Sequence, residues 1–293
     1  MARRNLAGRL SRLKQTQQNQ QKPQEKSSTR KSSDHETKGS FLPGWTQQSE
    51  WVWERQLILP AGSSGERPAV NHFLLERLYR MGRMDQLPEQ PEKLIFWDTE
   101  TTGLSGGAGT RVFLFGAGWW AGTDFRVHQV FLSDFPGEPE FLQRVTEILG
   151  TDSVFITYNG ASFDVPLLRG RCLFHGIPLS LRGHADLLHP ARRLWRRIIG
   201  PCSLGDIESE VLGVEREEDI PGVEIPDRWF SYLDSGDPSG LEPVIAHHLQ
   251  DICSLSVLLS RIASAAQTDD CPERVDPYGL GRLLHEAGNP KAE

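Results

Sequence analysis

The sequence has few cysteines and no pairing pattern among them. Cys172, Cys202, Cys253 and Cys271 are scattered, and no Cys-x-x-Cys pair occurs. This spacing argues against a zinc knuckle or a disulfide framework and is typical of a reducing compartment. We therefore expect a cytoplasmic protein.

Long apolar runs are also missing. No run of about 18 apolar residues occurs that could span a bilayer. The basic N-terminus has no apolar core like that of a secretory signal. We therefore expect no membrane partner.

The glycine-rich turn at 103–109 is not followed by the Gly-Lys-Ser/Thr of a Walker A loop. A P-loop site is therefore excluded.

Positive charge is concentrated at the N-terminus. The net charge is −7, but residues 1–40 carry ten Lys and Arg against three Asp and Glu, which leaves about −14 on the rest. Such an acidic body does not bind nucleic acid by charge alone, although acids can reach phosphates through metal ions. We expect residues 1–40 to be a disordered basic tail, either an electrostatic arm for nucleic acid or solvated chain.

The apolar pattern divides the rest of the chain into three parts. We predict an N-terminal extension packed on the core (41–91), a main domain (92–265) and a C-terminal tail with a short helix (266–293). The extension contains a predicted strand at 52–59. Its tryptophans Trp45, Trp51 and Trp53 are interpreted as core residues rather than a base-stacking platform.

The main domain begins with three predicted strands joined by short turns, which indicates an antiparallel meander. These strands lie within 94–104, 111–120 and 125–133, and a helix over 138–149 ends at Gly150. A fourth strand follows at 153–160, and the last long helix spans the apolar stripe from Ile245 to Ile262.

Carboxylates follow two of these strands. Asp98 and Glu100 are two apart on a buried strand, so their side chains share one face. Two acids at this position are costly unless a cation compensates them, and Mg²⁺ or Mn²⁺ prefers carboxylate oxygen. Asp164 follows the fourth strand at a strand-to-helix turn, where helix capping is the alternative explanation.

The final helix adds His247, His248 and Asp251. At about 100° per residue, His247 lies about 40° from Asp251 around the axis and His248 about 60° on the other side, so either imidazole can overhang the carboxylate. Asp186 is predicted to cap the basic helix that follows it, with support of the acidic site as the alternative. Each acid alone has a structural explanation, but the four together are the inventory of a two-metal phosphodiesterase.

In this order the motifs resemble those of the DEDD exonucleases of the RNase H-like superfamily. The three motifs are Asp98-Thr99-Glu100-Thr101-Thr102-Gly103-Leu104, Tyr158-Asn159-Gly160-Ala161-Ser162-Phe163-Asp164 and His247-His248-Leu249-Gln250-Asp251. More closely, the chain is similar to the bacterial YprB-type RNase H-like domain family of predicted exonucleases. This likeness covers residues 41–265 and extends to the segments 184–193 and 219–222.

The resemblance implies an α/β RNase H-like fold with a five-stranded mixed sheet flanked by helices. It implies that two Mg²⁺ or Mn²⁺ ions are held by four carboxylates, those of Asp98, Glu100, Asp164 and Asp251. It also implies that Thr102, Gly103 and Leu104 approach the terminal nucleotide at the 3′ end of single-stranded DNA or RNA, and that Asn159 is a polar contact.

The general base departs from the family pattern. Related families place His five residues, or Tyr four residues, before the last Asp, where this chain has Ala246 and His247. We interpret His247 as the replacement for Tyr, with His248 as the reserve.

The leading hypothesis is therefore a metal-dependent 3′–5′ exonuclease. The alternatives are an endonuclease of the same fold and a non-catalytic nucleic-acid-binding or scaffold protein.

Overall fold

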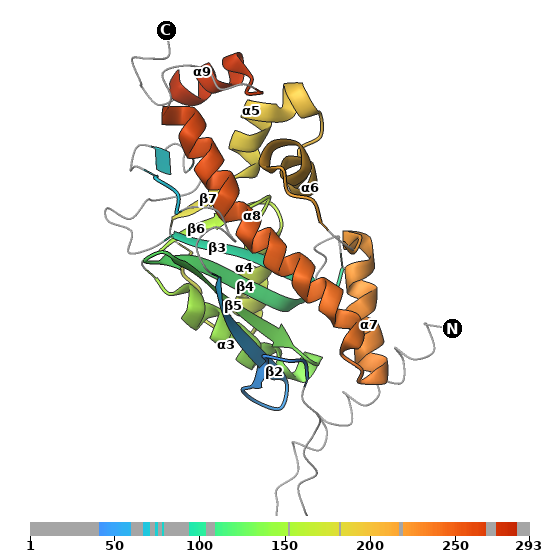
Figure 1. The fold of residues 1–293 in the computed structure, drawn as a ribbon. Coiled ribbons are helices and arrows are strands. Elements are labelled where there is room, and N and C mark those ends of the chain that lie inside the picture. Colours follow the sequence, from blue (N-terminus) through green and yellow to red (C-terminus); the bar gives the residue numbers. More distant parts are fainter. Residues whose placement is uncertain are drawn as a thin grey trace, which may run out of the picture. The chain divides into compact units, whose positions relative to one another are not determined.

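A mixed β-sheet lies at the centre of the described part of the chain (Figure 1). The structure, a computed structural model, describes residues 41–59, 67–70, 74–75, 78, 94–103, 109–151, 153–181, 183–216, 219–267 and 274–285. All of them belong to one unit, Ser40–Glu293. The predicted tail at 1–40 lies outside these residues.

Seven strands form the sheet within the described ranges. In chain order they are β1 (Thr46–Gln47), β2 (Val52–Leu59), β3 (Leu94–Thr101), β4 (Val112–Ala121), β5 (Asp124–Leu132), β6 (Val154–Thr157) and β7 (His184–Asp186). The spatial order is β1-β2-β5-β4-β3-β6-β7. Strands β3, β4 and β5 pair antiparallel, and β6 and β7 continue the sheet in parallel with β3. This confirms the predicted meander and the mixed sheet.

The predicted count of five strands is too low. Five strands, β3 to β7, belong to the main domain, but the extension adds β2, which pairs with β5 from Val52↔Leu132 to Leu59↔Phe125. The short strand β1 then pairs with β2. The strand at 52–59 was predicted, but its place at the sheet edge depends on a long-range pairing that periodicity does not reveal.

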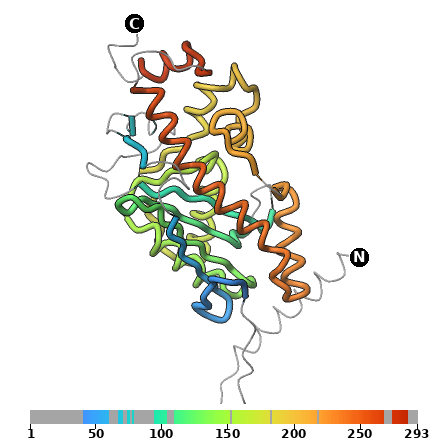
Figure 2. Tube along the Cα trace, in the orientation of Figure 1, coloured from blue at the N-terminus to red at the C-terminus, as the bar shows by residue number. Residues whose placement is uncertain are grey.

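The helices cover both sides of the sheet. They are α3 (Glu138–Leu149), α4 (Asp164–Phe174), α5 (Leu188–Ile199), α6 (Leu204–Ile207), α7 (Ile225–Ser235), α8 (Glu242–Gln267) and α9 (Pro277–His285), with short turns η1 (Phe135–Gly137), η2 (Glu208–Leu212), η3 (Gly222–Glu224) and η4 (Ser239–Leu241). Figure 1 shows α8 running diagonally across one face, with α3 and α4 on the other, and Figure 2 traces the same path.

Aromatic side chains of the extension join the core. The Phe41 ring stacks on Phe131 of β5 at 4.7 Å and lies 5.2 Å from the ring of Trp53. Trp45 is buried, and Trp51 and Trp53 pack against the same hydrophobic cluster. The interpretation of these tryptophans as core residues is confirmed.

Alternation along β3 divides the core between the two faces of the sheet. Ile95 and Trp97 belong to the cluster that includes Phe141 of α3. Phe96 belongs to the other cluster, together with Ile252 and Leu255 of α8. Because every side chain from Ile95 to Trp97 is fully buried, β3 is held rigidly at the centre of the sheet.

Helix α8 approaches the sheet closely over two glycines of β4. A Cβ on Gly116 would lie 2.4 Å from Cδ1 of Ile252 and 2.5 Å from Cε1 of His248. At Gly118 a Cβ would lie 2.8 Å from Cγ2 of Ile252. The missing side chains of β4 therefore set the distance between α8 and the sheet.

The segment Ser239–Gln267 is long and apolar enough to cross a membrane by length and composition. However, more than half of its apolar window is buried inside the fold. Its buried side chains include Ile252, Leu255, Leu259 and Ile262, which belong to the core cluster on this face of the sheet. The apolar character of α8 is therefore explained by packing.

Substitution of Gly116 by Ala should destabilise the protein by about 1–3 kcal/mol, because the new methyl group overlaps His248 and Ile252 of α8. Gly170→Ala in α4 is the matched control, since a Cβ there meets nothing within 4 Å. Urea unfolding of both variants measures the difference. Equal midpoints would show that the contact between α8 and β4 is not tight.

Candidate active site

The first two carboxylates lie on the face of β3 that α8 covers. Asp98 pairs with Gly116 and Glu100 with Leu114 of β4, so both side chains share the face of Gly116. The register shifts between Glu100 and Thr101, immediately after the second acid. The prediction that Asp98 and Glu100 share one face is therefore confirmed.

Asp164 is the first residue of α4, which follows β6. Its carboxylate accepts a hydrogen bond from the Thr99 hydroxyl of β3. Strands β3 and β6 are parallel neighbours, so their carboxyl ends meet at one edge of the sheet. Asp164 is thereby brought next to the two acids of β3.

A buried carboxylate, that of Asp186, holds the turn before Asp164. It accepts backbone hydrogen bonds from Asn159 (2.8 Å), Ala161 (3.1 Å) and Leu188 (3.0 Å). Asp186 ends β7, and the residue at the N-cap of α5 is Leu187 rather than Asp186 as predicted. The carboxylate nevertheless bonds the first amide of α5, and it also positions the second motif, which was the alternative.

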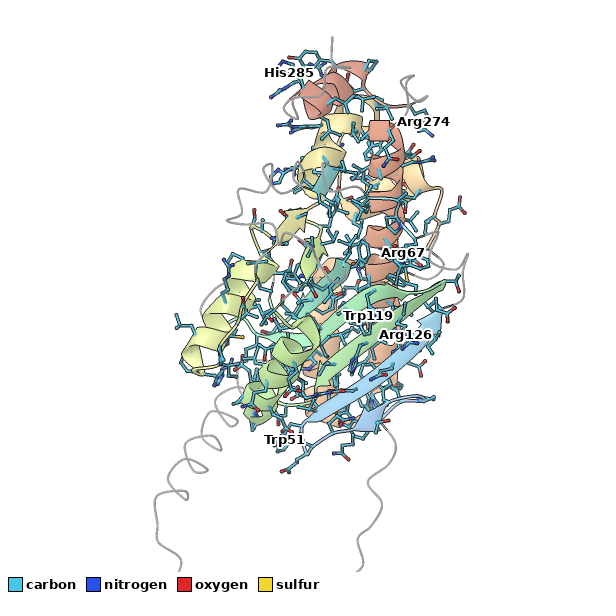
Figure 3. The ribbon with its side chains drawn as sticks, turned by 90° about the vertical axis from the view of Figure 1, so that its left-hand side faces the viewer. Trp51, Arg67, Trp119, Arg126, Arg274 and His285 are labelled. Atoms are coloured by element: carbon cyan, nitrogen blue, oxygen red, sulfur yellow. The ribbon has the colours of Figure 1, made fainter. Side chains whose placement is uncertain are left out.

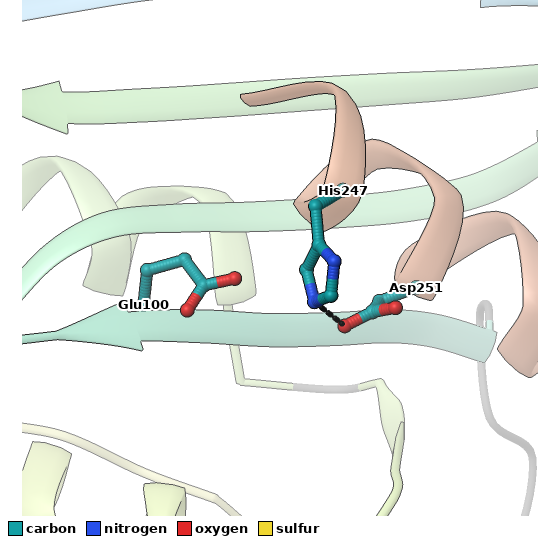
Figure 4. Close-up of side chains that lie close together, drawn as sticks. All are labelled: Glu100, His247 and Asp251. Atoms are coloured by element: carbon teal, nitrogen blue, oxygen red, sulfur yellow. Dashed lines mark ion pairs between the residues drawn. The ribbon is translucent and has the colours of Figure 1, made fainter. Parts of the chain in front are cut away.

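The third motif reaches the same place from α8. Ligand atoms of Glu100, His247 and Asp251 all lie within 4.8 Å of one another (Figure 4). Nε2 of His247 is 3.5 Å from Oδ2 of Asp251, one helical turn away. The structure therefore brings Glu100 of β3 together with the third motif of α8, while Asp98 and Asp164 lie close enough for their charges to act within the same group of acids.

Mutual repulsion and burial act on these acids. Burial raises the pKa of Asp98 well above its usual range, and the charges of Asp251, Asp164 and Glu100 raise it further. Burial and the charges of Asp251 and Asp164 likewise raise the pKa of Glu100. Burial raises the pKa of Asp164 to about 6. Such a cluster favours the binding of cations, which stabilise the ionised form of every member.

His247 is held by a carboxylate that the sequence analysis did not assign. Its Nδ1 lies 2.6 Å from Oδ1 of Asp219, in the loop before η3. Nδ1 donates to Asp219 in the tautomer that carries the hydrogen there, which leaves Nε2 as an acceptor on the side of Asp251, and Nδ1 accepts from Arg216 in the other tautomer. Burial raises the pKa of Asp219, but the hydrogen bond from His247 and the charges of His247 and Arg216 together outweigh burial, so this pKa is lowered.

His248 is not part of the acidic cluster. It is fully buried, and its Nδ1 lies 2.7 Å from Nε2 of Gln129, while Nε2 lies 3.1 Å from the backbone oxygen of Asp98. Because Oε1 of Gln129 accepts a hydrogen bond from Arg55 (2.6 Å), Nε2 of Gln129 donates to Nδ1 of His248. Burial lowers the pKa of His248 to about 3. The geometry makes it a neutral link between α8 and β3 and leaves His247 as the histidine at the acids.

Arg216 also lies at the site and was not predicted. Its guanidinium contacts Asp251, lies 2.9 Å from Nδ1 of His247 and makes two hydrogen bonds to Glu208, at 2.6 and 2.8 Å. The Arg216 side chain is only 13% exposed and that of Glu208 1%. No periodicity or motif in the sequence marks either residue, because they meet only when the loop after η2 folds back onto α8.

The residues expected to approach substrate lie at the edge of this cluster. The Thr102 amide donates to the Arg111 carbonyl (2.9 Å), and the Arg111 amide donates to the Thr102 hydroxyl (3.0 Å). Gly103 accepts a hydrogen bond from the Thr101 hydroxyl. Asn159 is exposed and has a positive φ of 63°, which Asn tolerates. Leu104 lies outside the described residues.

The donor set fits hard divalent cations. Four carboxylates offer oxygen ligands, which Mg²⁺ and Mn²⁺ prefer, and the cluster has no thiolate among its described members. One guanidinium, Arg216, supplies positive charge to Asp251. The remaining acids need further positive charge when ionised, so the site can accept metal ions.

Comparisons with known proteins agree with this architecture. A sequence model of the RNase H superfamily matches residues 95–263. An uncharacterized protein of Bacillus subtilis, YprB, is 39% identical over 165 residues, which cover 55% of this chain and 40% of that protein. A DNA polymerase of Methanocaldococcus jannaschii is 29% identical over 114 residues, which cover 31% of this chain and 7% of the polymerase. The chain thus spans less than half the length of these relatives.

Solved structures of exonuclease I also align with the chain. One gives a TM-score of 0.42 with 14% identity, covering 66% of this chain and 43% of that one. A complex of the E. coli enzyme with single-stranded DNA gives a TM-score of 0.38 with 16% identity, covering 60% and 41%.

Replacement of Arg216 by Met should lower the free energy of unfolding by about 3–5 kcal/mol, because it leaves the buried carboxylate of Glu208 without its charged partner. Arg228→Met is the control, since its pair with Glu224 on α7 is exposed and worth about 1 kcal/mol or less. Chemical denaturation without added metal measures both. A loss in Arg216→Met no larger than in the control would contradict a buried ion pair.

Proposed function

Because the chain belongs to the RNase H superfamily, we propose that it is a metal-dependent 3′–5′ exonuclease that hydrolyses phosphodiester bonds of DNA or RNA. The observation that carries the proposal is the meeting of acids from β3, α4 and α8 beside a histidine that is oriented by its own carboxylate. The 3′–5′ polarity rests on the motif order, which resembles that of the DEDD exonucleases.

In this proposal four carboxylates hold two divalent ions, Mg²⁺ or Mn²⁺. They belong to Asp98, Glu100, Asp164 and Asp251. When bound, such ions supply Lewis-acid stabilisation of the phosphodiester and lower the pKa of water. The protein contributes rigidity, since β3 is buried on both sides and α8 is fixed on the glycines of β4.

His247 is proposed as the general base. Its Nε2 is directed to Asp251 (Figure 4), while Nδ1 is engaged by Asp219 at 2.6 Å. A carboxylate at Nδ1 fixes the ring orientation and stabilises the imidazolium that forms when Nε2 accepts the proton of the attacking water. His248 cannot take this role, because both of its ring nitrogens are engaged in the core.

The terminal nucleotide is proposed to lie against Thr102, Gly103 and Asn159, which surround the acids at the carboxyl ends of β3 and β6. Leu104 completes the expected contact. These groups carry no readable base code, so the proposal covers DNA and RNA alike.

A time course with 5′-labelled single-stranded DNA and RNA tests the activity. With Mn²⁺ or Mg²⁺ we expect a ladder that shortens from the 3′ end, and with EDTA we expect none. Asp98→Asn and Asp251→Asn should abolish the ladder, because each removes a proposed metal ligand, while circular dichroism shows an intact fold. Full activity in either variant would show that the substituted residue is not a required metal ligand.

A circular single strand separates the alternatives in the same assay. Cleavage of the circle would show an endonuclease instead. Absence of cleavage of any substrate by the folded protein with either metal would favour a non-catalytic binding protein.

Substitution of His247 by Ala should reduce kcat by about 10²–10⁴-fold if it is the base. Asp219→Asn should reduce kcat with little change in KM, because the imidazolium that forms at His247 loses its carboxylate partner. Asp227→Asn, an exposed acid on α7, is the control. An unchanged kcat in Asp219→Asn would show that Asp219 does not act through His247.

A further inference from the structure

The four arginines of α5 fall into two pairs on different faces of the helix. Helix α9 packs against one face, where Nε of Arg197 lies 3.6 Å from Asp276 and its guanidinium lies 5.0 Å from the centre of the Tyr278 ring. Gly279 of α9 packs against the backbone of Arg193, where a Cβ would clash with the carbonyl oxygen. This face of α5 is therefore occupied by α9 (Figure 1).

The other pair, Arg192 and Arg196, lines an open groove of about 730 Å³. Tyr158, Asn159 and Ser203 also line the groove. Both arginines are exposed, and neither has a carboxylate within 4 Å among the described residues. Two guanidinium groups with no ionic partner in the described ranges thus lie one helical turn apart in a protein whose net charge is negative.

This groove adjoins the acidic cluster. Asn159 comes two residues after β6 ends, and Asp164 follows on the first turn of α4. The buried carboxylate of Asp186 bonds the amides of both Asn159 and Leu188, so one residue ties the catalytic turn to the start of α5. The position of the two arginines relative to the acids is therefore fixed by the fold.

The chemistry of the groove matches a phosphate chain. Guanidinium groups bind phosphate oxygens in a bidentate manner, and residues one turn apart on a helix have Cβ atoms about 5–6 Å apart. The Tyr158 hydroxyl donates to the Cys202 carbonyl (2.7 Å), which anchors the aromatic ring at the groove. A basic groove with an aromatic side chain is the usual surface for single-stranded nucleic acid.

We propose that this groove binds the sugar–phosphate backbone of single-stranded nucleic acid next to the scissile bond, with Arg192 and Arg196 each contacting one phosphate. The inference deepens the proposed function, on which it rests for the identity of the ligand. It adds a binding site outside the acids, which compensates for the repulsion between an acidic protein and its substrate.

Binding is measured by fluorescence anisotropy with labelled oligothymidylate and oligouridylate, in EDTA so that no turnover occurs. The test variant is Arg192→Gln/Arg196→Gln. The control is Arg126→Gln/Arg228→Gln, which removes the same charge from β5 and α7 (Figure 3 labels Arg126). Each single-strand phosphate contact contributes about 0.7 to the slope of log K against log salt, so the test variant should lose about 1.4 from the slope and the control much less.

A methylphosphonate scan locates the contacts. We neutralise one phosphate linkage at a time along the oligonucleotide, and at two linkages this should weaken binding to the wild type. In the Arg192→Gln/Arg196→Gln variant, neutralising the same two linkages should no longer change the affinity. Binding in the groove would be refuted if the wild type and this variant gave equal salt slopes and equal methylphosphonate scans. It would also be refuted if the wild type did not bind single strands at low salt.

The assay separates this inference from the proposed function. Suppose that the two substitutions weaken binding but the protein cleaves no substrate with either metal. This result would support nucleic-acid binding in the groove and refute the exonuclease activity. Cleavage from the 3′ end, with binding that is unaffected by the two substitutions, would support the exonuclease and refute the groove.

Discussion

The close contact between α8 and the sheet is the constraint on which the candidate site depends. Gly116 and Gly118 leave no side chain between β4 and α8, so Ile252 and His248 rest directly on the strand. His248 adds a hydrogen bond to the backbone oxygen of Asp98 (3.1 Å). One turn of α8 therefore places Asp251 and His247 next to the acids of β3. Any shift of α8 relative to the sheet moves both residues.

Electrostatics explains why the site needs cations. Burial and mutual repulsion raise the pKa values of Asp98 and Glu100, so ionisation of the whole cluster is unfavourable without added positive charge. Arg216 provides part of that charge and is itself held by the buried Glu208. The protein thus offsets only part of the negative charge internally and leaves the cluster, Asp251 included, short of positive charge. Arg192 and Arg196 are proposed to offer positive charge to the substrate outside this cluster.

Local patterns predicted much of this arrangement. Alternation placed Asp98 and Glu100 on one face, and helical spacing placed His247 near Asp251, because both effects depend on neighbours in the sequence. The end of α3 at Gly150 was predicted for the same reason.

Long-range contacts were not predictable in this way. Asp219 lies in a loop and contacts His247 of α8. Arg216 bonds both Glu208 and Asp251, and these three residues lie in separate segments of the chain. The distinction between His247 and His248 was also open, because it depends on which imidazole finds Gln129 and the Asp98 carbonyl in the core. The spacing of residues in the sequence does not predict these tertiary contacts.

A crystal structure of the protein soaked in Mn²⁺, with anomalous diffraction to locate the ions, would show whether the clustered carboxylates bind metal. The proposed site predicts two Mn²⁺ peaks coordinated by the carboxylates of Asp98, Glu100, Asp164 and Asp251, with His247 still paired to Asp219. Anomalous maps without a peak at these carboxylates, from crystals in which Mn²⁺ is bound elsewhere or not at all, would contradict it.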